Sequence, residues 1–323
     1  MRTSAEQIRA QASELDFELH AMEKVARLLE LLDALATSPL LRQHLVLKGG
    51  TALNLFLLDV PRLSVDVDLN LIGAPTREEL DELRPRIDAG LAAAFASQGL
   101  DVRRRPDAHA GGKWSLRYRS VFGQGGKLEV DLNTLQRVPL WEPVITPARL
   151  PVFSRRPTAL QEPHEIVAGK LAALVDRAAG RDLFDAHQLL THLDLDSRRL
   201  RLAFVVAGAQ SHRDLAGLSK DDVSAEPREL RHRLLPLLRR GHVPEVHGID
   251  AWIERLVGET RAAMAAVLPL REDEQAFLTA LHERGEIRPD LITSDETLRA
   301  RIASHPGLLW KAVNVRKHRE LDG

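Results

Sequence analysis

Two kinds of sequence pattern divide the chain near its middle. Residues 44–135 contain stretches in which apolar and polar residues alternate, and glycine-rich turns separate these stretches. Alternation with a period of two residues is typical of β-strands. From Glu162 onward apolar residues recur at helical spacing and no alternation persists. This division predicts an α/β domain with a mixed sheet, followed by an all-helical domain. We place the first domain, with an N-terminal helix, at residues 1–155 and the second at residues 156–323.

The same patterns predict the individual elements. Helix is expected over residues 4–37, and a short strand over 44–47 precedes a helix over 52–58, for which Thr51 would be the N-terminal cap. The other expected strands are residues 63–71, 100–105, 113–121 and 127–135. The other expected helices are residues 76–98, 163–178, 181–193, 197–208, 227–239, 249–266, 272–284, 294–303 and 306–319. Five prolines from Pro139 to Pro157 indicate a connecting arm.

Composition and charge exclude several classes of protein. The 323 residues are 44% hydrophobic and 28% charged, as in ordinary globular proteins. The formal net charge of −1 argues against a sequence-blind nucleic-acid binder with a global cationic field. Absence of cysteine excludes disulfides, thiolate zinc sites and a cysteine nucleophile. No apolar run is long enough for a membrane span and no signal-peptide core follows Met1, so we expect a cytoplasmic protein without a membrane partner.

A glycine pair after the first strand suggests an anion site. Lys48 is followed by Gly49 and Gly50, whose lack of a Cβ atom lets backbone N–H groups approach an anion. The helix that follows points its positive end at the same place, and the Thr51 hydroxyl offers another donor. These features predict a phosphate cradle.

Two carboxylates on the next strand suggest a metal. Asp66 and Asp68 are two residues apart and therefore share a strand face. Neighbouring carboxylates repel each other unless a cation neutralises them, and oxygen ligands of this kind suit Mg²⁺ together with substrate phosphates. Taken singly, Gly-Gly is usually a turn and Asp-x-Asp a solvated face. Their ordered combination predicts phosphoryl or nucleotidyl transfer.

The combination also resembles a known family. The pattern Lys48-Gly-Gly-Thr-Ala-Leu, then Arg62-x-Ser64-x-Asp66-x-Asp68-Leu, is similar to the nucleotidyltransferase superfamily, and within it to the AbiEii toxins, which include the mycobacterial MenT toxins. Two later stretches are similar to the same family: Glu165-x4-Lys170-Leu with Arg181-Asp182-Leu-Phe-Asp185, and Leu308-Leu-Trp310-Lys311-x2-Asn314. The resemblance implies a polymerase-β-like catalytic domain with a helical partner domain. It also implies NTP and Mg²⁺ as cosubstrates, tRNA as acceptor and a cognate antitoxin encoded nearby.

The resemblance assigns roles to the residues around the glycine pair. Gly49, Gly50 and Thr51, next to Lys48, would hold the β- and γ-phosphates, and Ser64 would lie beside the metal site. The magnesium ligands would be Asp66 and Asp68.

The resemblance also implies further acidic and basic site residues. Lys170 would contact the triphosphate, and Asp182 or Asp185 would complete the site. The superfamily usually has a third carboxylate on a neighbouring strand, where Glu129 and Asp131 share a face. We choose Asp131 as metal ligand or general base.

Each of these residues also has an interpretation in which it has no role in catalysis or binding. The residues alone are equally compatible with Lys170 as a surface lysine, Arg181–Asp182 as a helix-terminal charge pair and the strand of Asp131 as an ordinary surface strand. Whether Asp131 or Asp182 is the third acid stays open.

Residues 101–120 form a basic segment. Its basic residues are Arg103, Arg104, Arg105, Lys113, Arg117 and Arg119. Trp114 and Tyr118 lie among them and could stack on bases, which would make this segment an RNA-facing patch; the alternative is a solvated sheet face. Further basic stretches at residues 228–240 and 316–319 are read as solvated faces.

We therefore expect a Mg²⁺-dependent nucleotidyltransferase toxin of a toxin–antitoxin or phage-defence system. It would transfer NMP from NTP to an RNA, with the tRNA 3′ end as first candidate, and release pyrophosphate. The alternatives are a small-molecule nucleotidyltransferase of the antibiotic-modifying type and a non-enzymatic relative that binds nucleotide or a partner. The sequence does not name the preferred NTP.

Overall fold

The chain forms two compact units. The computed structural model describes residues 3–104, 111–123, 125–211, 213, 215, 217–224, 226–245 and 248–322. The first unit comprises Met1–Arg137, Pro143–Gln161 and Leu235–Pro244. The second comprises Val138–Glu142, Glu162–Leu234 and Glu245–Gly323.

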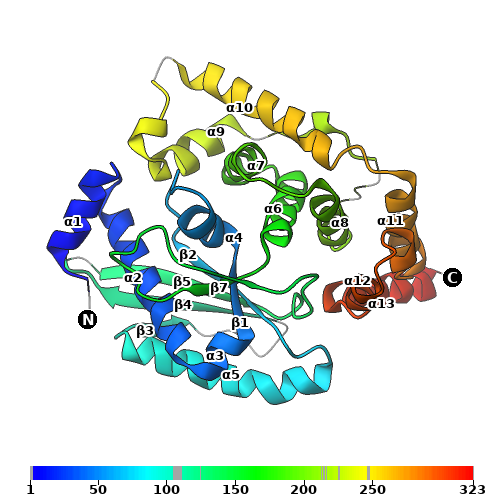
Figure 1. Cartoon of the computed structure of the whole chain (residues 1–323), viewed down its shortest axis with the longest axis horizontal. Coiled ribbons are helices and arrows are strands. Elements are labelled where there is room, and N and C mark those ends of the chain that lie inside the picture. The colour runs from blue at the N-terminus through cyan, green and yellow to red at the C-terminus, as the bar shows by residue number, and fades with distance from the viewer. Residues whose placement is uncertain are drawn as a thin grey trace. The chain divides into compact units, whose positions relative to one another are not determined.

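A seven-stranded mixed sheet of order β3-β4-β5-β2-β1-β7-β6 organises the first unit (Figure 1). Its strands are β1 (Leu45–Lys48), β2 (Asp66–Leu71), β3 (Asp101–Arg104), β4 (Gly111–Arg119), β5 (Gly125–Asn133), β6 (Val144–Thr146) and β7 (Thr158–Leu160). The pairs β2–β5 and β1–β7 are parallel, and the other neighbours are antiparallel. The mixed sheet expected from the sequence is therefore confirmed.

Helices cover both faces of this sheet. They are α1 (Ala5–Glu14), α2 (Leu19–Thr37), α3 (Pro39–His44), α4 (Gly49–Ala52), which continues as a π-helix over Leu53–Leu57, and α5 (Arg77–Ser97). Phe95 of α5 packs edge-on against Trp114 of β4, so α5 lies on the face from which Trp114 projects. Figure 1 shows α4 on the opposite side of the sheet from α5.

Four expectations in this unit are wrong. The N-terminal helix is split, because Asp16 takes a left-handed conformation (φ 55°) and ends α1 without the glycine that usually marks such a stop. Thr51 is not a cap, since the helix already begins at Gly49 with Lys48 in the N-cap position. The strand expected from residue 63 begins at Asp66. The arm of prolines contains β6 and is followed by β7, two strands too short for a periodic signal.

The described elements of the second unit are helical. They are α6 (Pro163–Arg177), α7 (Gly180–His192), α8 (Ser197–Gly208), α9 (Pro227–Glu229), α10 (Ile249–Ala263), α11 (Glu272–Arg284), α12 (Glu296–Ala303) and α13 (Pro306–Asp322). Helices α6, α7 and α8 lie side by side (Figure 1). The helix expected over 227–239 is broken: α9 becomes a π-helix at Leu230–Leu234, and Pro236 interrupts the next turn. Within the described residues, no helix is long and apolar enough to cross a membrane.

Candidate active site

The absence of side chains at the glycine pair lets residues of the neighbouring strand and loop pack closely against the start of α4. Gly49 has φ +70°, a conformation that favours glycine, and a Cβ atom there would collide with the carboxylate of Asp68. A Cβ atom on Gly50 would lie 2.9 Å from Ser64 Oγ and 3.0 Å from the Arg62 guanidinium. Both positions therefore require glycine, because Asp68, Ser64 and Arg62 approach the backbone too closely for a Cβ atom. A backbone without side chains at the start of a helix is also what a phosphate-binding site needs.

Hydrogen bonds of Thr51 connect the glycine pair to β2 and to the loop before it. Its buried hydroxyl donates to the carbonyl oxygen of Asp66 at 2.5 Å and lies 3.1 Å from Ser64 Oγ. Asn54 adds a hydrogen bond from Nδ2 to the carbonyl of Gly50 at 2.9 Å. The hydroxyl proton of Thr51 is thus engaged within the protein, so the residue positions the glycine pair relative to β2.

The carboxylates of β2 share one face with those of β5. Asp66 and Asp68 are half-buried and alternate with buried Val67 and Leu69. In the parallel β2–β5 register Asp66 lies opposite Glu129, and Asp68 lies opposite Asp131. On the other side of β2, Asp68 lies opposite Lys48 of β1. The sheet therefore brings Lys48, Asp68 and Asp131 into one row across three strands.

Glu129 and Asp131 have different surroundings. Glu129 accepts hydrogen bonds from Lys113 and Lys127, each at 2.6 Å, and these two ammonium groups lower its pKa to about 2. Asp131 is exposed and makes no hydrogen bond or ion pair with the part of the chain that the structure describes. Of the two candidates, only Asp131 has a carboxylate without a hydrogen bond from a lysine, although Lys113 lies opposite it in the β4–β5 register.

Two cations near the site were not predicted as site residues. Arg62 is 3% exposed, lies against Gly50 and donates from Nη1 to the carbonyl of Leu63 at 2.9 Å. Lys24 of α2 is half-buried; burial lowers its pKa, and the charges of Asp66 and Glu129 partly oppose this. Arg62 is part of the motif itself, whereas the only signal for Lys24 was a lysine within an apolar helical stretch.

The donors suit a magnesium ion shared with phosphates. Asp66 and Asp68 provide two carboxylates on one face, and the side-chain-free space at Gly49 borders Asp68. Among the residues that the structure describes, no three acidic, histidine or cysteine side chains are grouped closely enough to hold a metal. The two carboxylates of β2 are compatible with Mg²⁺, which commonly uses one or two carboxylates and takes its other ligands from phosphates and water.

A second charged cluster lies between α6 and α7 of the second unit. Lys170 Nζ is 3.0 Å from Asp182 Oδ1 and 2.9 Å from Asp185 Oδ2, and Arg177 Nε is 2.6 Å from Asp182 Oδ2. Both carboxylates are buried. Burial raises the pKa of Asp182, but the charges of Lys170 and Arg177 outweigh it and hold that pKa below its ordinary value. The structure thus brings Lys170, Asp182 and Asp185 together, and Lys170 is not a freely solvated surface lysine.

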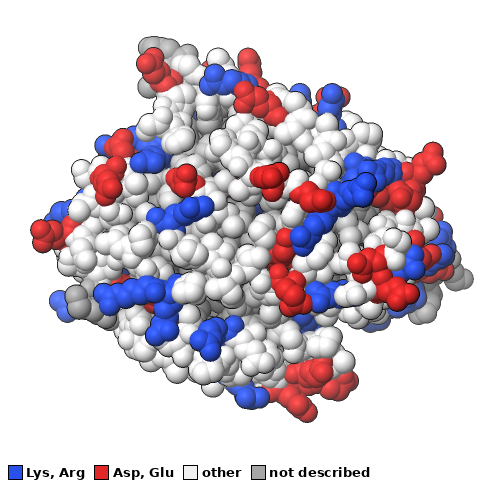
Figure 2. All heavy atoms as spheres, viewed as in Figure 1, with Lys and Arg blue, Asp and Glu red and all other residues white. Residues whose placement is uncertain are grey.

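The basic segment divides between the two faces of the sheet. Trp114 and Tyr118 are buried, with exposed fractions of 5% and 8%, so neither ring is available to stack on bases as the interpretation of an RNA-facing patch requires. Arg117 and Arg119 alternate with them and are exposed, as is Lys113. Figure 2 shows basic and acidic side chains interspersed on the face in view. Arg105 and the side chain of Arg104 lie outside the described residues, and Arg103 faces Asp101 at 3.6 Å.

Comparison with models of protein families shows to which family the chain is related. The family described as nucleotidyl transferase AbiEii toxin, type IV toxin–antitoxin system, matches residues 30–298. The chain belongs to the AbiEii family. It is therefore a nucleotidyltransferase toxin of a type IV toxin–antitoxin system, a membership that implies transferase activity, an NTP substrate and a cognate antitoxin. The family match contains both the glycine and carboxylate site and the Lys170 cluster.

A solved structure is similar to this AbiEii chain over nearly its whole length. The nucleotidyltransferase toxin MenT4 from Mycobacterium tuberculosis H37Rv matches with a TM-score of 0.57 and 19% identity, covering 95% of this chain and 99% of MenT4. At this identity the likeness concerns the fold, which is the α/β fold of MenT nucleotidyltransferases. No curated protein sequence matches the chain.

Proposed function

We propose that this toxin transfers NMP from NTP to the 3′ end of an RNA, with tRNA as the acceptor, in a Mg²⁺-dependent reaction. The observation that carries the proposal is the packing of Asp68 against Gly49, which joins a carboxylate pair to a helix start free of side chains. Backbone N–H groups at a helix start bind phosphate, and paired carboxylates bind Mg²⁺. We therefore propose the cytoplasm, where NTP and tRNA are both present, as the site of the reaction.

The glycine cradle would bind the triphosphate. The N–H groups at Gly49 and Gly50 would donate to its β- and γ-phosphates, with Lys48 beside them. Arg62 adds a buried positive charge next to Gly50, and Thr51 and Ser64 hold the glycine pair against β2. Mg²⁺ bound by Asp66 and Asp68 would neutralise charge on the phosphates.

The transfer itself needs a base for the attacking hydroxyl. The 3′-hydroxyl oxygen of the RNA would form a bond to the α-phosphorus, and the bond to the bridging oxygen would break so that pyrophosphate leaves. Asp131 would accept the hydroxyl proton, since its residue lies in register with Asp68 and its exposed carboxylate accepts no hydrogen bond from the described residues.

Lys170 would assist the same reaction by contacting the triphosphate as a point charge. Asp182 and Asp185 would act as positioning residues, because their carboxylates accept hydrogen bonds from its ammonium group and keep it charged and ordered. The exposed basic residues of β4, Lys113, Arg117 and Arg119, would contact phosphates of the acceptor RNA.

The test is transfer from each of the four NTPs, labelled at the α-phosphate, to purified tRNA, to total RNA and to small hydroxyl compounds such as aminoglycosides. We expect Mg²⁺-dependent label in tRNA, and none after periodate oxidation of its 3′ end. The Asp68→Asn protein serves as the inactive control. Label on the small compounds alone would instead establish a small-molecule nucleotidyltransferase, and absence of transfer to any acceptor would remove the proposal.

A further inference from the structure

The first unit contains a cavity that the proposed reaction does not use. It has a volume of about 420 Å³, within the range of ligand-binding pockets, and lies among α2, α3, β1 and β7. Its wall is mainly aliphatic, built by Leu32, Leu35, Leu41, Leu45, Leu47 and Leu69. Phenylalanine, tyrosine and tryptophan are absent from the described lining, so the wall suits a flexible alkyl chain.

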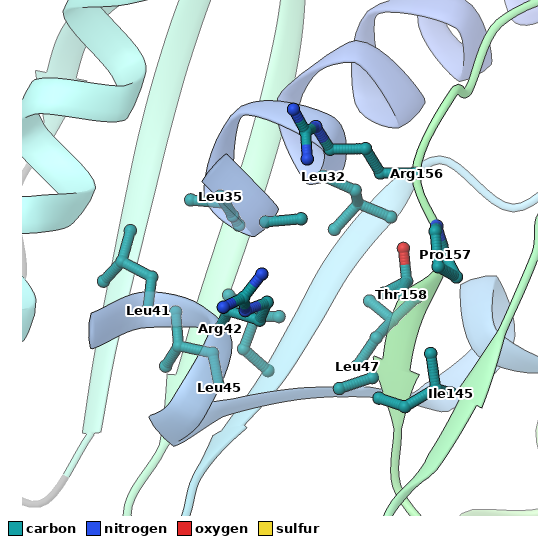
Figure 3. Close-up of a pocket in the computed structure, with 13 residues that line it drawn as sticks. Leu32, Leu35, Leu41, Arg42, Leu45, Leu47, Ile145, Arg156, Pro157 and Thr158 are labelled. Atoms are coloured by element: carbon teal, nitrogen blue, oxygen red, sulfur yellow. The ribbon is translucent and has the colours of Figure 1, made fainter. Parts of the chain in front are cut away.

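Two arginines lie at the edge of this apolar wall. Arg42 of α3 and Arg156, which precedes β7, are exposed residues of the lining and lie beside its leucines (Figure 3). Neither guanidinium makes an ion pair or hydrogen bond with any residue that the structure describes. Thr158 adds a hydroxyl to the lining. An apolar cavity with two unpaired cations at its edge is complementary to an amphipathic anion.

We propose that this cavity binds an aliphatic carboxylate, with the alkyl chain among the leucines and the carboxylate between Arg42 and Arg156. Guanidinium groups bind carboxylates through charge-assisted hydrogen bonds. Burial of the chain removes apolar surface from water, so each additional buried methylene should tighten binding about fourfold.

The site lies on the other side of the sheet from the carboxylate pair. Leu47 and Leu69 are register partners that line the cavity, whereas Lys48 and Asp68 are the next register partners and project from the opposite face. A ligand in the cavity therefore leaves the glycine pair and the β2 carboxylates accessible. Binding can be measured without any transfer assay, so its failure and the failure of the proposed function are separate results.

The probes are hexanoate, octanoate and decanoate, titrated calorimetrically into the full chain below their micellar concentrations, with decanol as the uncharged analogue. We expect saturable binding at one site, tightening with chain length, and weaker binding of decanol. Arg42→Gln and Arg156→Gln should each weaken decanoate roughly tenfold or more while leaving decanol unchanged. Arg155→Gln, which removes an adjacent exposed arginine outside this cavity, is the matched control and should bind decanoate like the wild type.

Ala36→Phe tests the location independently, because a phenyl ring from α2 would occupy the cavity and should abolish binding of both probes. Should this variant fail to fold, shifts of the leucine methyl resonances of the wild type upon addition of decanoate replace it. Absence of saturable binding, affinity that does not depend on chain length, or equal loss in Arg155→Gln would each overturn the proposal.

Discussion

Gly49 and Asp68 approach so closely that the first residue of α4 can carry no side chain. The strand register explains this contact, since Lys48 is the partner of Asp68 and the chain turns into α4 at the next residue. The start of α4, the glycine pair and the Asp68 carboxylate therefore pack as one unit. A substitution at Gly49 or Asp68 should alter the position of the other residue.

Replacing Gly49 by alanine should abolish transfer and lower stability. The left-handed backbone costs a residue with a Cβ atom about 1–3 kcal/mol, and the new methyl group must also displace the Asp68 carboxylate. Gly73→Ala is the matched control, because Gly73 has a similar φ of +78° but borders His44. Urea unfolding should show a loss of stability for both proteins, and the transfer assay should show a loss of activity for Gly49→Ala alone. Normal transfer by Gly49→Ala would contradict the tight packing.

Replacing Asp68 by asparagine should separate activity from stability. Loss of one metal carboxylate should cost several kcal/mol of transition-state stabilisation, roughly a thousandfold in rate or more. The melting temperature without metal should change little, because Asp68 is repelled by Asp66 and Asp131 but lies opposite Lys48, so loss of its charge removes a repulsion and an attraction together. Asp101→Asn on β3 is the control, since its carboxylate is exposed and outside this row. Full activity of Asp68→Asn with Mg²⁺ present would refute the assignment.

The sequence was informative wherever a local pattern determines the result. Strand period 2 is a property of the backbone, so Asp66 and Asp68 share a face as predicted. Helix α11 has the predicted bounds, Glu272–Arg284, because a cluster of acidic residues begins it and Gly285 ends it in a left-handed conformation. The same alternation separates Trp114 from Lys113 and Arg117, a distinction that the basic composition of the segment does not reveal.

Other features depend on tertiary contacts that no local pattern encodes. The hydroxyl of Thr51 bonds to Asp66, fifteen residues away, although its sequence context suggested a helix cap. Strands β6 and β7 have three residues each and exist only through pairing with each other and with β1. Lys24 comes near Asp66 through the packing of α2, which the helical periodicity alone does not specify.

Lys170→Ala should lower stability in a pH-dependent manner. In the wild type the pKa of Asp182 is below its ordinary value, so the stabilising contribution is complete above about pH 4 and is lost as pH falls through the lowered pKa. Without Lys170 the buried carboxylates of Asp182 and Asp185 lose a cation, which should cost about 3–5 kcal/mol at pH 7. That cost should shrink as the pH falls toward 4, because the buried Asp182 carboxylate is easier to protonate once the charge of Lys170 is removed. The measurement is the free energy of unfolding of the wild type and the variant between pH 4 and pH 7. Lys220→Ala, at an exposed position, is the control. A loss of stability that does not depend on pH would contradict the ion-pair explanation.

Trp114→Ala should affect folding and leave RNA binding unchanged. The indole is 5% exposed and packs against Phe95, so truncation should cost about 3–5 kcal/mol in the free energy of unfolding. The affinity of the folded variant for tRNA, measured at low temperature, should equal that of the wild type. A selective loss of tRNA affinity without a change in stability would restore a stacking role for this ring.

Charge reversal at Arg117 and Arg119 should weaken the use of RNA while leaving the use of NTP unchanged. A chain with net charge −1 has no global field to hold RNA, so local cations must bind its phosphates. Both arginines are exposed on the face of β4 that is opposite to buried Trp114 and Tyr118. The double variant Arg117→Glu and Arg119→Glu should therefore raise the apparent KM for tRNA.

The salt dependence of tRNA binding distinguishes binding to phosphates from other causes. The slope of log affinity against log salt should decrease in size by roughly 0.7 for each phosphate that the variant no longer neutralises. Arg77→Glu with Arg86→Glu on α5 is the matched control, because it makes the same change in charge at exposed positions of a helix that packs on the opposite face of the sheet. If both double variants shift KM and slope equally, the effect comes from net charge. If neither shifts them, β4 is a solvated sheet face, and the acceptor must be bound by other residues.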